Sequence, residues 1–289
     1  RYLFKYTYFS WRLSLKNINS NRIVEDILRG SFDLHVHSGP DVKSELRFGP
    51  LETARYAQEF GMKGFVLKSH HYSTAPIVSM LNDIYPDLTI ISSITLNDEI
   101  GGINPKAVQS AVDMGAKVVW FPTDIQTGKK NHSFLTDNLG RLTNPVLEIL
   151  EIVKSRDLLI ASGHMNFHDS QLLFKTAKEM KIQKMLLTHP LSFIELDQQL
   201  ELVNLGVKIE FAFLACTPSR TRSTVKDFSQ MINKVGIHSC VLTTDFGQWL
   251  NPVPAEGMRM AIAELLNVGM KPEELIVLAK DNPINLLEI

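Results

Sequence analysis

Cysteine is scarce in this sequence, and neither sign of charge is in excess. Cys216 and Cys240 form no CxxC pair and no disulfide framework, which fits a reducing compartment, so we expect a cytoplasmic protein. The 30 basic and 31 acidic residues give a formal charge of −1, which predicts no attraction to nucleic acid or to an anionic membrane. No apolar run approaches the roughly 20 residues that cross a bilayer. We therefore expect a small-molecule substrate as partner, and a homo-oligomer is left open.

A repeated module fills most of the chain. From about residue 32 onward, short apolar runs rich in β-branched residues alternate with polar or Gly/Pro-containing loops and amphipathic stretches of helical period. The eight runs cover residues 32–37, 64–70, 89–97, 116–123, 158–164, 184–190, 207–213 and 239–247. Such near-continuous apolar character is typical of parallel strands that are covered on both faces.

Eight βα units at this spacing predict an α/β protein with the (β/α)8 TIM-barrel fold. The alternative is a doubly wound open sheet, but no GxGxxG motif follows the first run, and polar residues end many runs instead of marking one switch point. We assign residues 31–289 to the barrel and residues 1–30 to an N-terminal extension that packs on it. The polar segment 127–145 is expected to be either a lid over the mouth or a disordered insertion.

The first run ends in the sequence DLHVHSGPD, residues 33–41. Because side chains on a strand alternate between faces, His35 and His37 project to the same side, which in a barrel strand is the lumen. Paired neutral imidazoles suit Zn and, with less preference, Fe, Mn or Ni. An isolated HxH is more often a polar strand edge. The motif therefore indicates a metal site only if other strands supply further ligands.

Three further candidate ligands end later runs. His164 ends the fifth run, His189 the sixth, and Asp245 lies near the end of the eighth. The carboxyl ends of barrel strands meet at one face, where barrel active sites are built. We therefore expect a divalent metal at this mouth, preferably Zn with Mn or Fe as alternatives and with one or two ions bound. Its expected ligands are His35, His37, His164, His189 and Asp245.

This pattern resembles the amidohydrolase superfamily of metal-dependent barrel hydrolases, whose ligands are HxH on strand one, His on strands five and six, and Asp on strand eight. The resemblance spans nearly the whole chain, including the ending DNPINLLEI, and the sequences GPDV and KSHH resemble a group of predicted metal-dependent hydrolases. It implies that His35 and His37 bind metal and that His164 and His189 bind metal or polarise the substrate. It also implies that Asp245 contacts the metal and its water.

The resemblance implies a hydrolase that cleaves an amide, lactone or other ester bond of a small molecule. A bound metal would lower the pKa of water from about 15.7 toward about 7. Asp245 would act as general base and then general acid, with His189 as the second catalytic residue. The same ligand set also supports decarboxylation or hydration, and a phosphoesterase on a related barrel is a further alternative. A non-catalytic metal-binding barrel is the alternative from a different class.

One departure from the superfamily concerns the fourth strand. Many two-metal members bridge their ions through a modified Lys there, whereas residues 119–124 read VWFPTD. Lys68 in the second run has three alternative roles. It is a carbamylated bridge between two ions, a free ammonium that binds a substrate anion, or a member of a structural salt bridge. The adjacent His70 and His71 would point to opposite faces of an extended chain, so at most one readily reaches the lumen. One of them, with His70 as our candidate, is expected to bind substrate or transfer protons, and a structural role is the alternative.

Several other charged residues are candidates for the mouth of the barrel. Arg47 follows the first run, and Arg220 with Arg222 follows the seventh, where they would clamp a carboxylate or phosphate; solvated loop arginines are the plainer interpretation. Glu210 lies among apolar residues of the seventh run and must be paired if it is buried. We expect it near the metal or as an ion partner of Lys68.

Overall fold

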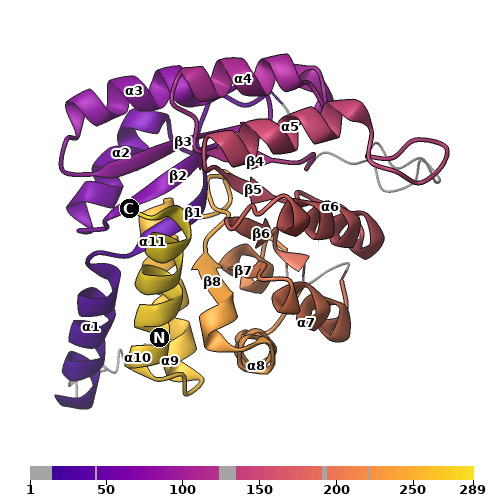
Figure 1. Ribbon diagram of the computed structural model, residues 1–289. Coiled ribbons are helices and arrows are strands. Elements are labelled where there is room, and N and C mark those ends of the chain that lie inside the picture. Colours follow the sequence, from indigo (N-terminus) through magenta and orange to yellow (C-terminus); the bar gives the residue numbers. More distant parts are fainter. Residues whose placement is uncertain (1–14, 43, 124–134, 191–193, 221) are drawn as a thin grey trace, which may run out of the picture.

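The computed structural model describes residues 15–42, 44–123, 135–190, 194–220 and 222–289. Within these ranges, eight strands pair in parallel and in sequence order, with helices outside them (Figure 1). This nearly closed (β/α)8 barrel confirms the fold expected from the repeated module. The strands are β1 (Phe32–His37), β2 (Gly64–Lys68), β3 (Thr89–Thr95), β4 (Val118–Trp120), β5 (Leu159–Ala161), β6 (Met185–Leu187), β7 (Lys208–Ala212) and β8 (Cys240–Thr243).

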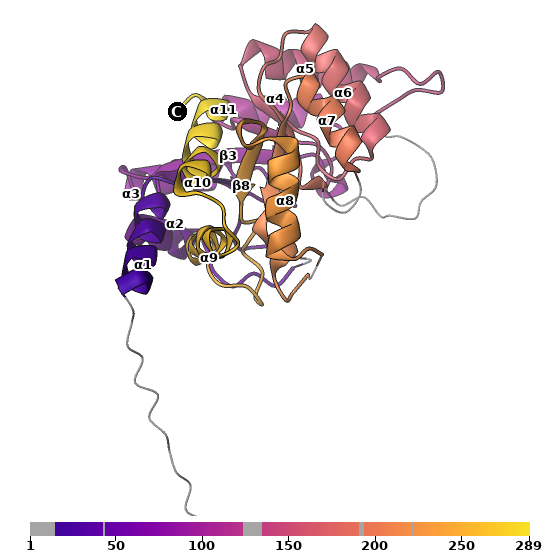
Figure 2. The same cartoon turned by 90° about the horizontal axis from the view of Figure 1, so that it is seen from below.

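The helices are distributed around the strands, as Figure 2 shows from below. The α-helices are α1 (Leu15–Leu28), α2 (Pro50–Glu59), α3 (Ala75–Ile84), α4 (Pro105–Asp113), α5 (Asn144–Ser155), α6 (Phe167–Glu179), α7 (Leu196–Asn204), α8 (Val225–Val235), α9 (Pro254–Asn267), α10 (Pro272–Ile276) and α11 (Asn282–Leu287). Short 3-10 turns are η1 (Asp98–Ile100), η3 (Phe213–Cys216) and η4 (Ile237–Ser239), and η5 (Val277–Asp281) is π-helical. Helices α2, α4 and α9 begin with proline, which lacks only an N–H that has no partner in the helix.

Several strands are shorter than the apolar runs of the sequence. β5 ends at Ala161 and β6 at Leu187, so His164 and His189 belong to the loops beyond these strands. Asp245 likewise follows β8. At β5 the chain turns at Gly163, whose φ of +62° takes the backbone out of the sheet. These three candidate ligands therefore lie beyond the ends of their strands, whereas His35 and His37 belong to β1 itself.

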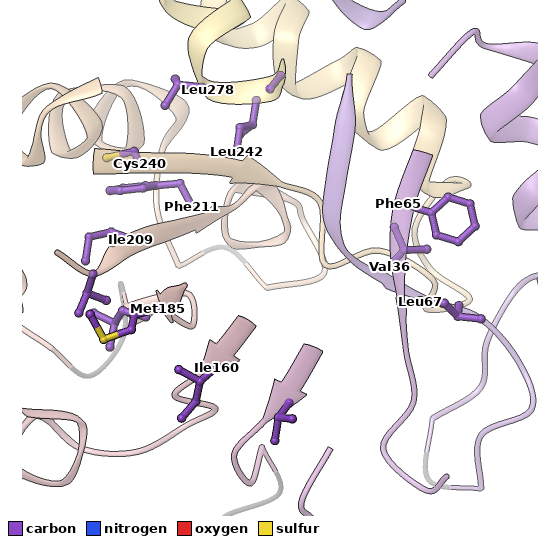
Figure 3. Packing of buried hydrophobic residues seen from close by; sticks show 14 of the residues in the cluster. Val36, Phe65, Leu67, Ile160, Met185, Ile209, Phe211, Cys240, Leu242 and Leu278 are labelled. Carbon is purple, nitrogen blue, oxygen red and sulfur yellow. The ribbon is translucent and has the colours of Figure 1, made fainter. Parts of the chain in front are cut away.

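The hydrophobic core has two layers. In the outer layer, strand side chains pack against the helices, and Figure 3 shows part of it, including Val36, Phe65, Leu67, Ile160, Ile209 and Phe211. A separate buried cluster fills the inside of the barrel with Phe32, Leu34, Val66, Val118, Trp120, Leu186 and Val241. Leu286 and Leu287 of α11 join this inner cluster near the starts of the strands. Apolar packing thus occupies the lower barrel and leaves the opposite end for polar groups.

Hydrogen bonds between β1 and the segment after β8 draw the barrel together. The amide of Asp245 donates to the carbonyl of His35 at 3.0 Å, and the amide of His37 donates to the carbonyl of Phe246 at 2.8 Å. Beside them the buried carboxylate of Asp33 accepts the hydroxyl of Thr244 at 2.5 Å and its amide at 3.1 Å. These hydrogen bonds hold the first strand of the barrel beside the segment that follows the last strand.

The N-terminal part of the described chain is a helix on the outside of the barrel. α1 contacts α9 and α10, and it buries Val24, Ile27 and Leu28. None of the helices in the described ranges has the length and apolar character needed to cross a membrane. Residues 1–14 of the expected N-terminal extension and residues 127–134 of the expected lid segment lie outside the described residues.

We expect Gly163→Ala to destabilise the fold strongly. A Cβ at this position would lie 2.2 Å from the carbonyl oxygen of Phe121 and 2.4 Å from that of Pro122, in addition to the strain of the positive φ. Left-handed strain and overpacking together should lower the free energy of unfolding by about 3 kcal/mol. Gly140→Ala is the control, because its φ is +72° and nothing lies within 4 Å of the added Cβ. Equal losses in urea denaturation for both variants would contradict the steric explanation.

Candidate metal centre

The imidazoles of β1 meet the carboxylate that follows β8. The Nε2 atoms of His35 and His37 lie 3.2 Å apart, so both rings point to the same place. Asp245 Oδ1 lies 3.3 Å from His35 Nε2 and 3.1 Å from His37 Nε2. These three donors are all buried and lie within 4.8 Å of one another. Such an arrangement could hold a metal ion.

Two more imidazoles approach from the loops after β5 and β6. His164 Nε2 and His189 Nε2 lie 3.2 Å apart, and His189 Nε2 is 3.7 Å from Asp245 Oδ2. The His189 ring also stacks on His35, with 5.6 Å between the ring centroids. The structure thus brings together all five residues that were expected to bind metal.

The backbone of Asp245 is unusual for a residue other than glycine. Its φ is +56°, in the left-handed region, while Gln248 Nε2 donates to its carbonyl at 2.8 Å. Asp tolerates this conformation better than most residues, and strained backbone of this kind is concentrated at functional sites. Gly247, two residues later, packs so closely on His37 that a Cβ would lie 2.2 Å from its carbonyl oxygen. The sharp turn therefore sets Asp245 against the HxH pair.

Glu210 of β7 orients the histidines from below. One of its oxygens lies 2.8 Å from His35 Nδ1 and accepts the hydroxyl of Thr243 at 2.9 Å, and the other accepts the amide of His189 at 3.1 Å. When Nδ1 of His35 carries the proton, its Nε2 lone pair faces the centre and is ready for a metal. Burial, followed by the charge of Asp245, raises the pKa of Glu210 to about 8. Of the two places expected for Glu210, the structure shows the one near the metal ligand candidates, through His35, while its charge also acts on Lys68.

The imidazoles of the centre are held in the neutral form. Burial lowers the pKa of His35, His37 and His189 well below the ordinary value, and burial together with the charge of Lys68 lowers that of His164 to about 4. Burial alone would raise the pKa of Asp245, but the neighbouring His35, His189 and Lys68 lower it. A carboxylate among neutral imidazoles is the protonation state that binds metals.

Lys68 lies at the end of β2 with a side chain that is 1% exposed. Burial lowers its pKa to about 8, while Asp245 and Glu210 oppose this shift. The Nζ atom of Lys68 lies 5.3 Å from the centroid of the Trp120 ring, and the centroids of the Trp120 and His35 rings lie 4.7 Å apart. Trp120, at the end of β4, therefore lies beside both Lys68 and His35.

A cavity of about 240 Å³ opens onto the centre. Its lining residues include the ligand candidates His37, His164, His189 and Asp245, the neighbours Lys68 and His70, the apolar Ala212 and Leu214, and the polar Ser44, Arg220, Arg222 and Gln248. Basic side chains and candidate metal ligands therefore line the same cavity, and Ala212 and Leu214 form its apolar wall.

The arginines expected at the mouth have different environments. Arg220 and Arg222 line the cavity, and both are exposed. Arg47 is not among the described residues that line it; its Nη1 donates to the carbonyl of Asn251 at 3.1 Å and its guanidinium lies 5.6 Å from the centre of the Phe48 ring. In this arrangement Arg47 links the loop after β1 to the loop after β8.

A second group of metal-ligating side chains lies beside the first. Asp41 Oδ2 is 3.1 Å from His70 Nδ1, and Asp41 Oδ1 is 3.1 Å from His71 Nε2. His70 stacks on His37 with 4.6 Å between ring centroids. Strand periodicity gives no role to Asp41 or His71, because both lie in loops; the available signal is an Asp four residues after His37 and a pair of adjacent histidines.

Comparison with known proteins places this site in context. The family described as "Family of unknown function (DUF6282)" matches residues 30–210, and no curated protein matches the sequence. An amidohydrolase from Pseudomonas aeruginosa is 13% identical with a TM-score of 0.62, over 93% of this chain and 98% of its own. A lactonase from Listeria monocytogenes is 14% identical with a TM-score of 0.61, over 89% and 94%. The phosphotriesterase homology protein from Escherichia coli, complexed with phosphate in its active site, is 12% identical with a TM-score of 0.63, over 89% and 98%.

At these identities the likeness establishes the fold. The barrel of this chain has the fold of these three structures, as the resemblance drawn from the sequence predicts for the fold. Several of the similar structures are described as hydrolases, while the reaction of this chain has to be inferred from its own residues.

Glu210 offers a test of how the histidines are oriented. Glu210→Ala removes the acceptor of His35, Thr243 and His189 and should lower the free energy of unfolding by about 3 kcal/mol. Glu210→Gln resembles the protonated carboxyl that prevails at pH 7 in the metal-free protein, and it should lose only about 1 kcal/mol. Both variants should bind Zn about 10–100-fold more weakly. Unchanged Zn affinity in titration calorimetry would refute the orienting role.

Proposed function

The chain belongs to DUF6282, a family of unknown function, and we propose that it is a metal-dependent hydrolase acting on an amide, lactone or other ester bond of a small molecule. The observation that carries the proposal is the convergence of four imidazoles and one carboxylate, of which all but His35 line a single cavity. The ligand candidates are His35, His37, His164, His189 and Asp245.

The donor set fits a divalent transition metal. Imidazole nitrogen suits Zn and Fe, and a carboxylate beside it is compatible with Zn or Mn, so Zn is our first choice. The contact between His35 Nδ1 and Glu210 at 2.8 Å is the kind of outer hydrogen bond that fixes a metal-binding imidazole. Five donors at an open cavity exceed the four that close a structural zinc, which supports a catalytic role for the ion over a purely structural one.

When bound, the metal would supply a water of lowered pKa and polarise the substrate oxygen. Asp245 Oδ1 and Oδ2 both face the imidazoles, so this carboxylate is placed to take the proton of the attacking water. Asp245 then returns the proton to the leaving group, acting as general base and general acid in turn. His189, 3.7 Å from Asp245, is our candidate for the group that polarises the scissile bond.

The substrate is proposed to be a small molecule with an anionic group. A cavity of about 240 Å³ suits a compact ligand, and Lys68, Arg220 and Arg222 all line it, so positive groups surround the space above the centre. Leu214 and Ala212 offer an apolar contact on another side. We also propose a cytoplasmic location, since Cys216 and Cys240 are both free thiols.

Two enzyme classes remain as competitors of the hydrolase. A phosphoesterase gains support from Arg220 and Arg222 at the cavity, because guanidinium groups bind phosphate well. Decarboxylation or hydration could use the same ligand set. A screen of esters, lactones, amides and phosphates with metal-loaded protein separates these classes, and turnover of none of them would favour the non-catalytic barrel.

Metal content is the first test of the proposal. Elemental analysis of the purified protein should find Zn, Mn or Fe, and His35→Ala/His37→Ala should lose the ion at the centre. The matched control is His168→Ala/His238→Ala, which removes two exposed imidazoles away from the cavity and should keep the full metal content. A folded wild type that takes up no metal after supplementation would overturn the proposal.

Asp245→Asn tests the proton-transfer role. The amide keeps the shape of the side chain but cannot accept the proton, so turnover of the substrate found in the screen should fall by about 10²–10⁴-fold. Circular dichroism and metal analysis should show that the fold and the bound ion persist. Near-normal turnover in this variant would remove Asp245 from the mechanism.

The titration of Lys68 should set the alkaline limb of the pH profile of kcat/KM. Its pKa of about 8 means that the ammonium is present below this pH and lost above it, so kcat/KM for an anionic substrate should fall above about pH 8. A bound cation nearby would shift this limb to lower pH. Lys68→Arg keeps its charge and should lack the limb, whereas Lys68→Met should bind the substrate weakly at every pH. An unchanged profile in Lys68→Met would exclude Lys68 as the titrating group.

A further inference from the structure

Asp41, His70 and His71 form a compact group that shares no residue with the five ligand candidates. Asp41 lies in the loop after β1, and the two histidines follow β2. One donor atom from each side chain lies within 4.8 Å of the others. Two imidazoles and a carboxylate are a common ligand set for zinc and related ions.

The Asp41 carboxylate is the unusual member of this group. Its side chain is only 2% exposed, and the His71 side chain beside it is 10% exposed. Its Oδ1 accepts the amide of Ser44 at 2.8 Å, and each of its oxygens faces one imidazole at 3.1 Å. Nearby positive charge stabilises an ionised carboxylate that is withdrawn from water, and a cation between Asp41 and the imidazoles would add to the charge of Lys68.

We propose that Asp41, His70 and His71 form a second binding site for a divalent transition metal, Zn or an ion of similar ligand preference. Ligands of a tetrahedral zinc at about 2.0–2.2 Å stand about 3.3–3.6 Å from one another. The two distances from Asp41 to the imidazoles are 3.1 Å, so small side-chain adjustments would open the group around an ion.

The backbone of this site is held in place before any ion binds. The amide of His71 donates to Ser69 Oγ at 3.2 Å, and Asn97 Nδ2 donates to the carbonyl of His70 at 3.3 Å. Ser69 and Asn97 are both buried. The two imidazoles are thus carried by a loop whose path is fixed from β2 and from the residues after β3.

The second site needs no bridging side chain from β4. Two ions in separate groups of ligands need no shared bridging side chain, and Trp120 at the end of β4 offers none. His70 lines the cavity and stacks on His37, so an ion on the Asp41 group would lie at the edge of the same cavity. There it could bind an anionic oxygen of a ligand.

Metal stoichiometry with crossed variants tests this site without using activity. Zn should bind to the wild type with one more equivalent per chain than to Asp41→Asn or His71→Gln, measured by equilibrium dialysis and elemental analysis. His35→Ala/His37→Ala should retain that equivalent and lose it when Asp41→Asn is added. His168→Ala, an exposed histidine outside both groups, should match the wild type.

Equal stoichiometry in the wild type and Asp41→Asn would overturn the second site, even if the first centre binds its ion. If the variants fail to fold, wild-type crystals soaked in Zn give the answer by anomalous diffraction at the Zn edge. A peak in contact with Asp41, His70 and His71 supports the site, and its absence at full occupancy of the first centre overturns it.

Discussion

The junction between β1 and the end of β8 is the constraint on which the candidate site depends. Asp33 is fully buried and accepts hydrogen bonds from His35 and from both the amide and the hydroxyl of Thr244. Burial raises the pKa of this carboxyl to about 7, so the hydrogen bonds only partly offset the cost of its position. Without this junction, Asp245 would not meet the HxH pair, and the barrel would hold scattered imidazoles instead of a centre.

Charge balance explains how so many polar groups share the top of one barrel. Lys68, Glu210 and Asp245 are all buried, and the histidines between them are neutral. An uncompensated charge would be costly here, whereas one ammonium among carboxyl groups and hydrogen-bonded imidazoles is tolerated. The apolar cluster below, built around Phe32, Leu34 and α11, keeps water out of the lower barrel and gives these groups a rigid floor.

The sequence predicts the barrel and the grouping of its main ligand candidates because both follow from regular geometry. His35 and His37 share a face through strand periodicity, and His164, His189 and Asp245 meet them because parallel strands in a barrel end at one face. Contacts between side chains that depend on the paths of loops are not predictable in this way. The approach of Asp41 to His70 and His71, and the contact of Arg47 with the carbonyl of Asn251, both arise from loops. Glu210 was expected in the right region, but its contact with His35 depends on side-chain packing across strands.

The fluorescence of Trp120 should report on the candidate metal centre. Its indole is fully buried, its Nε1 has no hydrogen-bond partner among the described residues, and its ring lies against His35. Of the two other tryptophans, Trp249 is 54% exposed and Trp11 lies outside the described residues. A buried indole emits at shorter wavelength than an exposed one, so Trp120, whose ring contacts His35, should emit at shorter wavelength than Trp249. The chain thus carries its own fluorophore at the place where a paramagnetic ion would quench it.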